Sequence, residues 1–147
     1  MILVRAATPD DAETMSAVLI ASITELCAED HRNDPTLIVQ WTANKTPEAV
    51  RAMFGRSQAL FVAECDGEIA AVGLVAGREI ALNYVSPAHR FAGVSKALLA
   101  AMEAALGPGE AALTSTRTAR RFYRDAGWVE VSSPTRDAES YPMRKRL

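Results

Sequence analysis

With 147 residues, 49% of them hydrophobic and 23% charged, the chain is long enough for one domain with its own core, which we predict over residues 1–147. Its formal net charge of −2 argues against a dedicated nucleic-acid binder, whose surface is expected to be basic. The sequence holds no apolar run of membrane-spanning length and no signal-peptide pattern, which predicts a cytoplasmic protein without a membrane partner.

The first third of the sequence predicts one strand and three helices. An alternating apolar segment opens the chain, and Thr8-Pro9 and Thr46-Pro47 each place a capping hydroxyl before the residue favoured at the first helical position. Apolar residues with near-helical spacing follow both caps and mark a short segment between them. The expected elements are a strand over 2–6, a helix from 8 to about 29, and shorter helices over 37–41 and 46–54.

The middle of the sequence predicts three consecutive strands. Ala59–Cys65 and Glu68–Ala76 are apolar segments separated by Asp66-Gly67, a dipeptide typical of tight hairpin turns. The next segment, Glu79–Val85, alternates with a period of two residues and ends before Pro87, as a third strand would.

The last third of the sequence predicts two further helices among short strands. Helical spacing begins after Gly93, and Gly107-Pro108-Gly109 stops it. The expected elements are a helix over 94–106, a strand over 111–114, a helix over 116–125, a strand over 128–131, a polar loop over 132–140 and a final strand over 141–147. This order predicts an α+β fold, with a mixed, mostly antiparallel central sheet flanked by helices.

The turn before the helix at 94–106 is a candidate anion site. The first amides of a helix lack intrahelical acceptors, and the helix dipole places positive charge beside them. Gly93 keeps the approach to these amides open, and Arg90 and Lys96 add positive charge on either side of it. The alternative is an ordinary connection between a strand and a helix that contains a permissive glycine.

Two runs in this half of the chain resemble the GNAT-family N-acetyltransferases. The run YVSPAHRFAGVSKALL, residues 84–99, resembles the family's acetyl-coenzyme A signature, Arg/Gln-x-x-Gly-x-Gly/Ala between an apolar strand and an apolar helix. The run TRTARRFYRDAGW, residues 116–128, resembles a later family helix that ends Phe-Tyr-x-x-x-Gly-Phe. The chain departs from the signature at Phe91-Ala92, where the family has glycine or a basic pair, and at Ser95, where it has a second small glycine or alanine.

The resemblance implies a GNAT-like domain that uses acetyl-coenzyme A as its cosubstrate and needs no metal. It implies transfer of the acetyl group to a primary amine of a small molecule or peptide, by direct attack on the thioester. The alternative is a non-catalytic sensor or interaction module of the same fold that binds acyl-coenzyme A. The cofactor-binding residues implied are Asn83, Tyr84 and Val85, on a strand splayed from its neighbour, then Arg90, Phe91, Ala92, Gly93, Val94, Ser95 and Lys96 at the phosphates, and Thr116 and Tyr123.

Tyr123 is the catalytic residue that the second run implies. The family places a tyrosine at this position beside the coenzyme A sulfur, where a phenol can protonate or stabilise the leaving thiolate. A phenol near pKa 10 facing a thiol near 8.5 makes that proton transfer uphill by about 2 kcal/mol. The alternative is a core tyrosine whose hydroxyl has a buried partner.

Glu79 is the candidate general base. It begins its predicted strand at a position similar to that of the catalytic glutamate in the histone-acetylating branch of the superfamily. Strict alternation would place it on the same face as Ala81, Asn83 and Val85. The alternative is a solvated carboxylate at the start of a strand.

Other polar residues predict surface positions rather than chemistry. We expect Glu25, Glu29 and His31 to be surface residues near the acceptor side, His89 to be solvated, and Cys27 and Cys65 to be reduced thiols that pack. A basic stripe on the helix of Tyr123 is either a solvated face or a contact to coenzyme A phosphates; it consists of Arg117, Arg120, Arg121 and Arg124. By analogy with the family, the final strand could support a homodimer.

Overall fold

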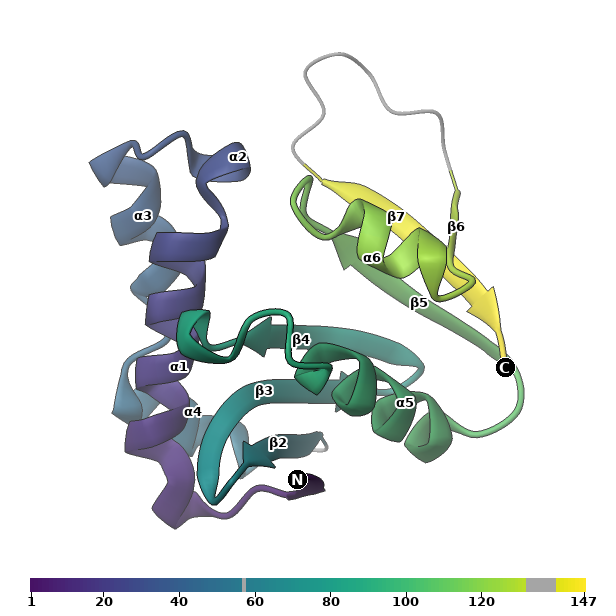
Figure 1. Ribbon diagram of the computed structural model, residues 1–147, viewed down its shortest axis with the longest axis horizontal. Helices are drawn as coiled ribbons and strands as arrows, with labels where there is room; N and C mark the ends of the chain where they lie inside the picture. Colours follow the sequence, from purple (N-terminus) through teal and green to yellow (C-terminus); the bar gives the residue numbers. More distant parts are fainter. Residues whose placement is uncertain (57, 132–139) are drawn as a thin grey trace.

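The computed structural model describes residues 1–56, 58–131 and 140–147, so the predicted loop over 132–140, apart from Ser140, lies outside the described residues. Its centre is a seven-stranded sheet with the order β1-β2-β3-β4-β5-β7-β6 (Figure 1). The strands are β1 (Ile2–Ala6), β2 (Ala59–Cys65), β3 (Glu68–Ala76), β4 (Glu79–Val85), β5 (Glu110–Ser115), β6 (Val129–Glu130) and β7 (Tyr141–Arg146). The helices are η1 (Pro9–Asp11), α1 (Ala12–Leu26), α2 (Ala28–His31), α3 (Pro35–Thr42), α4 (Pro47–Met53), η2 (Pro87–His89), α5 (Val94–Leu106) and α6 (Arg120–Asp125).

The predicted α+β fold with a mixed sheet is confirmed. The strand pairs are antiparallel except β4 with β5, which are parallel and joined by the crossover helix α5. β7 lies between β5 and β6, so the final strand is an inner strand of the sheet. β6 therefore pairs with part of the edge through which the final strand could support a homodimer. Each helix in the described ranges is too short or too polar to cross a lipid bilayer.

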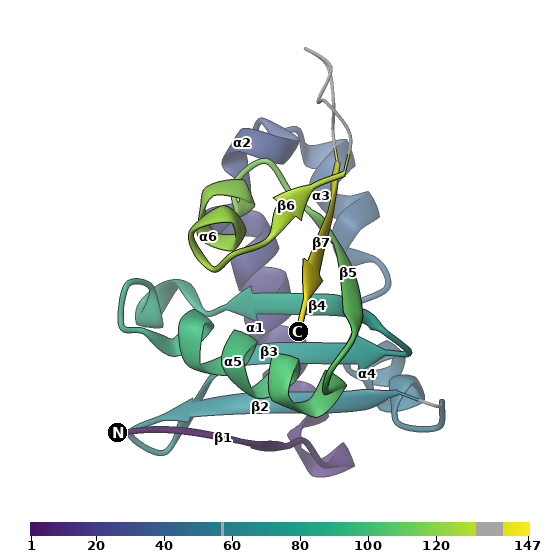
Figure 2. The same ribbon diagram turned by 90° about the vertical axis from the view of Figure 1, so that its right-hand side faces the viewer.

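Helices cover both faces of the β2–β3–β4 part of the sheet (Figures 1 and 2). α5 packs on one face, where Leu98 and Met102 are buried with β3 residues. α1 and α4 pack on the other face around Met15, Leu19 and Val50. Gly73 lets α5 approach closely, because a Cβ atom there would lie 2.6 Å from the sulfur of Met102.

Two predicted helices are shorter than expected. The first breaks at Cys27, whose backbone (φ −103, ψ 28) separates α1 from α2. α6 begins at Arg120 rather than at Thr116, because the amides before it have acceptors outside a helix. The Asp30 carboxylate accepts hydrogen bonds from the Arg117 and Thr118 amides, and the Thr116 hydroxyl oxygen accepts one from the Ala119 amide.

A β-bulge in β4 changes which side chains share a face. Ile80 pairs with Val75 and Leu82 with Leu74, so Ala81 is an extra residue without a partner in β3. Ile80 therefore packs on the face covered by α5, whereas Leu82 packs on the face covered by α1. Because side chains alternate again beyond the bulge, Asn83 shares the α5 face with Ile80, and Glu79 lies on the opposite face. The predicted common face of Glu79 and Asn83 is therefore wrong.

β4 and β5 form a wedge. They pair only at Glu79 with Ala112 and Ile80 with Leu113, and they then diverge towards Val85 and Ser115 (Figure 1). The predicted splaying of the strand around Asn83 is confirmed. The wedge leaves one edge of β4 open to whatever occupies the space between the strands.

The start of α1 is tied to the sheet by an ion-pair network, which gives a testable stability prediction. Arg5 donates to both carboxylate oxygens of Asp11, at 2.9 and 3.1 Å, and to Glu64 at 2.8 Å. Hydrogen bonds from Arg5 and from the Thr8 amide lower the pKa of Asp11 to about 2, against the effect of partial burial.

We expect Asp11→Asn to lower the free energy of unfolding by about 1–2 kcal/mol at pH 7. The native-state pKa is depressed, so this stabilisation is fully present above the unfolded-state pKa near 4 and is lost as the pH falls towards 2. Urea unfolding of both proteins at pH 7 and pH 2.5 measures the effect. An equal difference at the two pH values would contradict the assignment.

Candidate active site

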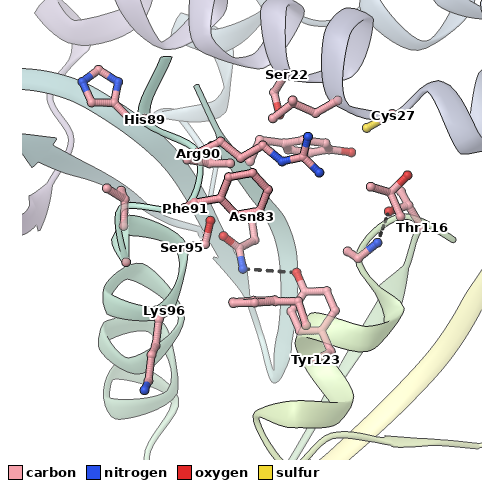
Figure 3. A pocket seen from close by; sticks show the side chains of 18 residues that line it. Ser22, Cys27, Asn83, His89, Arg90, Phe91, Ser95, Lys96, Thr116 and Tyr123 are labelled. Carbon is pink, nitrogen blue, oxygen red and sulfur yellow. Dashed lines mark hydrogen bonds between the residues drawn. The ribbon is translucent and has the colours of Figure 1, made fainter. Parts of the chain in front are cut away.

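A cavity of about 360 Å³ opens where β4 and β5 diverge (Figure 3). β4, the turn after it, the start of α5 and the end of α1 form one side, and the loop after β5 and α6 form the other. The lining residues are Ser22, Leu26, Cys27, Asn83, Tyr84, Val85, His89, Arg90, Phe91, Gly93, Val94, Ser95, Lys96, Thr116, Thr118, Ala119, Phe122 and Tyr123.

The start of α5 forms the anion-binding end of this cavity. Gly93 has φ +81, a left-handed conformation that glycine adopts without strain, and it caps the helix. By helix geometry, the amides of Val94, Ser95 and Lys96 have no intrahelical acceptor. Arg90 and Lys96 place two cations in the same lining. The arrangement suits a phosphate or diphosphate group.

Phe91 adopts an unusual conformation in this turn. Its φ is +66, in the region that favours glycine, and 90% of the residue is exposed. The Arg90 guanidinium lies over its ring, 4.6 Å from the centroid. At Phe91, where the family signature allows glycine, this chain therefore keeps a glycine-like backbone conformation. It adds an exposed aromatic ring beside the amides.

Tyr123 and Asn83 meet at the other end of the cavity. The Asn83 amide donates to the Tyr123 hydroxyl oxygen at 3.2 Å, which leaves the phenolic hydrogen free to point elsewhere (Figure 3). Tyr123 is 6% exposed and makes edge contacts with the rings of Phe122 and Trp128. The Asn83 Oδ1 atom is buried without a hydrogen-bond partner and remains available as an acceptor.

Burial keeps the titratable groups around Tyr123 in their neutral forms. It raises the pKa of Tyr123 to about 12, although the Asn83 hydrogen bond acts in the opposite direction. It raises the pKa of Tyr84 as well, with smaller contributions from nearby groups, of which Cys27 is the largest. Burial and the charge of Asp30 raise the pKa of Cys27 to about 11, so this thiol is not an activated nucleophile at neutral pH.

The structure brings together most of the predicted site residues. Every predicted cofactor-binding residue except Ala92 lines the cavity. Glu79 is exposed at the start of β4, where β4 still pairs with β5, and does not belong to the lining. The structure therefore does not bring the candidate base together with Tyr123.

Two predictions about neighbouring polar residues need revision. His31 is fully buried rather than at the surface: its Nε2 lies 2.8 Å from the Ile23 carbonyl oxygen, and its Nδ1 accepts from the Asn33 amide at 3.0 Å. The His89 side chain is only 18% exposed and lines the cavity, with Nε2 3.5 Å from Glu68, so it is not a solvated turn residue.

The basic stripe on α6 and in the loop before it was interpreted either as a solvated face or as a contact to coenzyme A phosphates, and the structure does not support the second interpretation. Arg120 is engaged with Glu130 at 2.6 Å and lies over the Tyr141 ring, and Arg121 is 4.0 Å from Asp125. None of the four arginines belongs to the cavity lining formed by the described part of the chain. Contact between this stripe and a phosphate in the cavity is therefore not supported.

Sequence reasoning placed the acceptor side at the end of the first helix, but it did not identify the residues that form this wall. Ser22, Leu26 and Cys27 line the cavity, and Thr118 and Phe122 face it from the loop after β5 and from α6. These are ordinary helix and loop residue types without a motif. The one available signal was the apolar spacing along the first helix, which predicts packing but not a cavity.

With amides for a diphosphate at the start of α5 and a buried phenol across the wedge, the chain has the organisation of an acetyltransferase that uses acyl-coenzyme A. Comparison with protein-family models makes this specific. The model of the acetyltransferase (GNAT) domain matches residues 27–147, and the chain therefore belongs to the GNAT acetyltransferase family. A search of curated protein sequences found no significant match.

Solved structures share the fold over the full length of the chain. A GCN5-related N-acetyltransferase from Rhodopseudomonas palustris has a TM-score of 0.86 and 22% identity, covering 99% of this chain and 95% of its own. The PaiA N-acetyltransferase from Thermoplasma acidophilum, solved in complex with coenzyme A, has a TM-score of 0.80 and 19% identity, covering 100% and 99%. At these identities the likeness establishes the fold.

Proposed function

We propose that this protein is an N-acetyltransferase that moves an acetyl group from acetyl-coenzyme A to a primary amine of a small molecule or peptide. The observation that carries the proposal is the cavity itself, which joins the free amides of α5 to the buried Tyr123 hydroxyl. A binding module would need the first of these but has no need for the second. The thiols of Cys27 and Cys65 are free, which fits the cytoplasmic location we infer.

The residues of the outer half of the cavity fit a coenzyme A diphosphate. The amides of Val94, Ser95 and Lys96 would donate hydrogen bonds to its oxygens, and Arg90 and Lys96 would balance its charge. The open edge of β4 and the unpartnered Asn83 Oδ1 offer main-chain and side-chain partners for the polar groups of an extended arm. Acetyl-coenzyme A would supply the activated acetyl thioester.

The role proposed for Tyr123 is donation of a hydrogen bond to the departing sulfur. With a pKa of about 12, complete proton transfer to a thiolate of pKa near 8.5 is uphill by about 5 kcal/mol in the empty site. A phenol of this pKa remains protonated and stabilises the thiolate as a donor. Asn83 holds the phenol oxygen in place, so the hydrogen is directed into the cavity rather than to Asn83.

The acceptor amine is proposed to enter between α1 and the loop after β5. The side chains there are Ser22, Leu26, Cys27, Thr116 and Thr118, and they are uncharged at neutral pH. An α-amine of pKa near 8 is partly unprotonated at pH 7, whereas a lysine-type amine must lose a proton at a cost of about 4.6 kcal/mol. This end of the cavity therefore favours acceptors with a weakly basic amine.

A thermal-shift and thiol-release pair of experiments tests the proposed function. Acetyl-coenzyme A at a hundred times its Kd should stabilise the protein by about 2.7 kcal/mol. An amine panel in which free thiol is followed should then identify acceptors. Absence of any shift at millimolar acetyl-coenzyme A would refute the proposal, and binding without thiol release for every amine would favour the acyl-coenzyme A sensor instead.

The pH dependence of turnover gives a further prediction. We expect kcat/KM to rise with pH as the acceptor amine deprotonates and to show no decline up to about pH 10, because Tyr123, with a pKa of about 12, keeps its proton over that range. A tyrosine with the ordinary pKa near 10 would lose its proton, and with it activity, above about pH 9. A pH–rate profile with stability checked at each pH decides between them.

A further inference from the structure

We propose that Asp30 is a positioning residue that ties the two walls of the cavity together and thereby sets the place of Tyr123. The inference rests on the proposed function for its catalytic consequence but not for its structural one. It starts from the position of α2, which projects from the end of α1 and faces the loop that leads into α6 (Figures 1 and 2). Neither sequence motif contains Asp30.

The Asp30 carboxylate accepts three hydrogen bonds from that loop. The Arg117 amide donates to Oδ1 at 2.6 Å, and the amide and hydroxyl of Thr118 donate to Oδ2 at 3.2 and 2.5 Å. The bonds are charge-assisted and connect residues 87 and 88 positions apart. The Asp30 side chain on α2 thus supplies the acceptors that hold the loop before α6.

The site of this contact makes it a tie across the wedge. β4 and β5 pair only at their Glu79–Ala112 end, so their other ends diverge. α1 packs on β4 through residues such as Leu19 and Leu82, and it carries α2 on that side of the wedge. The loop after β5 belongs to the other side. The Asp30 contact therefore joins the two sides at the open end, where Cys27 and Thr118 line the cavity.

The tie reaches Tyr123 through a short chain of contacts. The loop residues 117 and 118 lead directly to Ala119, whose carbonyl accepts from the Tyr123 amide at 3.2 Å. Tyr123 in turn meets Asn83 of β4 at 3.2 Å, across the wedge. A loop that moves away from α2 would carry Tyr123 away from Asn83 and from any sulfur beside it.

The test compares Asp30→Ala with Glu29→Ala, a matched truncation of the neighbouring, exposed carboxylate on α2. We expect Asp30→Ala to lower kcat about tenfold, since small misplacements of reacting groups have effects of this size or larger. The Kd for acetyl-coenzyme A should change less than about threefold, because the diphosphate end lies on α5. Thr118→Val, which removes the hydroxyl from the other side of the tie, should lower kcat in the same direction and serves if Asp30→Ala folds poorly.

A double mutant tests whether Asp30 acts through Tyr123. If it does, Asp30→Ala should lower kcat by less than about twofold in a Tyr123→Phe background, because the two effects are then not independent. A tenfold loss in both backgrounds, or a parallel loss of kcat and coenzyme affinity, would overturn the proposal.

A spectroscopic measurement separates this proposal from the proposed function. Tyrosines labelled with ¹³C at Cζ give three ring signals, from Tyr84, Tyr123 and Tyr141, which single Tyr→Phe variants assign. Asp30→Ala should shift the Tyr123 signal of the ligand-free protein, and Glu29→Ala should not. A shifted Tyr123 signal in a protein that never transfers acetyl groups would support the structural role of Asp30 and refute the proposed acetyltransferase activity. An unshifted signal in an active enzyme would refute the tie alone.

Discussion

Replacing Tyr123 with phenylalanine is expected to lower kcat about a hundredfold while leaving the Kd for acetyl-coenzyme A within about twofold, because a positioned donor to the leaving group contributes effects of this size. The ring and its contacts with Phe122 and Trp128 remain, so the variant should fold. Removal of the hydroxyl also leaves the Asn83 amide without its acceptor, which is expected to cost about 1 kcal/mol of stability.

Tyr141→Phe is the matched control for this experiment. Tyr141 is a buried tyrosine on β7, 5% exposed, and it lies outside the cavity lining. Its hydroxyl can be removed without touching the proposed chemistry, so turnover should stay within about twofold of wild type. Steady-state kinetics and calorimetric binding measure both variants. Unchanged turnover in Tyr123→Phe would remove the phenol from the mechanism.

Ser95→Asp is expected to weaken acetyl-coenzyme A binding about a hundredfold, although it should stabilise the folded protein. A carboxylate near a diphosphate repels it by about 1 to 4 kcal/mol at 4 Å, depending on the local dielectric. The same carboxylate in the first turn of α5 interacts favourably with the helix dipole, by about 0.3–1 kcal/mol. Stability and affinity should therefore change in opposite directions, which general damage to the fold cannot produce.

Ser95→Asn separates charge from size in this experiment. Asparagine has nearly the shape of aspartate but no charge, so its coenzyme affinity should lie within about fivefold of wild type. Calorimetric titration with coenzyme A, together with thermal unfolding in its absence, measures both quantities. Equal losses of affinity in the two variants would show that the space at Ser95, rather than the charge, limits binding.

Elements with strong local signals could be predicted from the sequence. The bounds of β2, β3 and β4 agree with the prediction, because apolar alternation and turn dipeptides fix short strands locally. The cavity-lining turn from Arg90 to Lys96 was also predicted, since Gly93 and the apolar stripe after it mark a helix start. In both cases the determining interactions lie within a few residues of one another.

Features that depend on distant contacts could not be predicted. The bulge at Ala81 follows from the pairing of β4 with β3, and it moved Glu79 to the opposite face. The burial of His31 depends on the Ile23 carbonyl and the Asn33 amide, which the break at Cys27 brings to it. The late start of α6 depends on Asp30, whose carboxylate binds amides 87 and 88 residues away. No local sequence pattern encodes these contacts between distant residues.

The amide-lined start of α5 has a consequence for how freely this family can diverge. Main-chain N–H groups have the same chemistry whatever neutral side chain follows them, so selection for coenzyme binding acts on the path of the backbone. This chain keeps the path with Phe91 at φ +66 and Ser95 in the first turn. Substitutions by other uncharged residues at these positions should accumulate with little loss of affinity, whereas Gly93 should tolerate few.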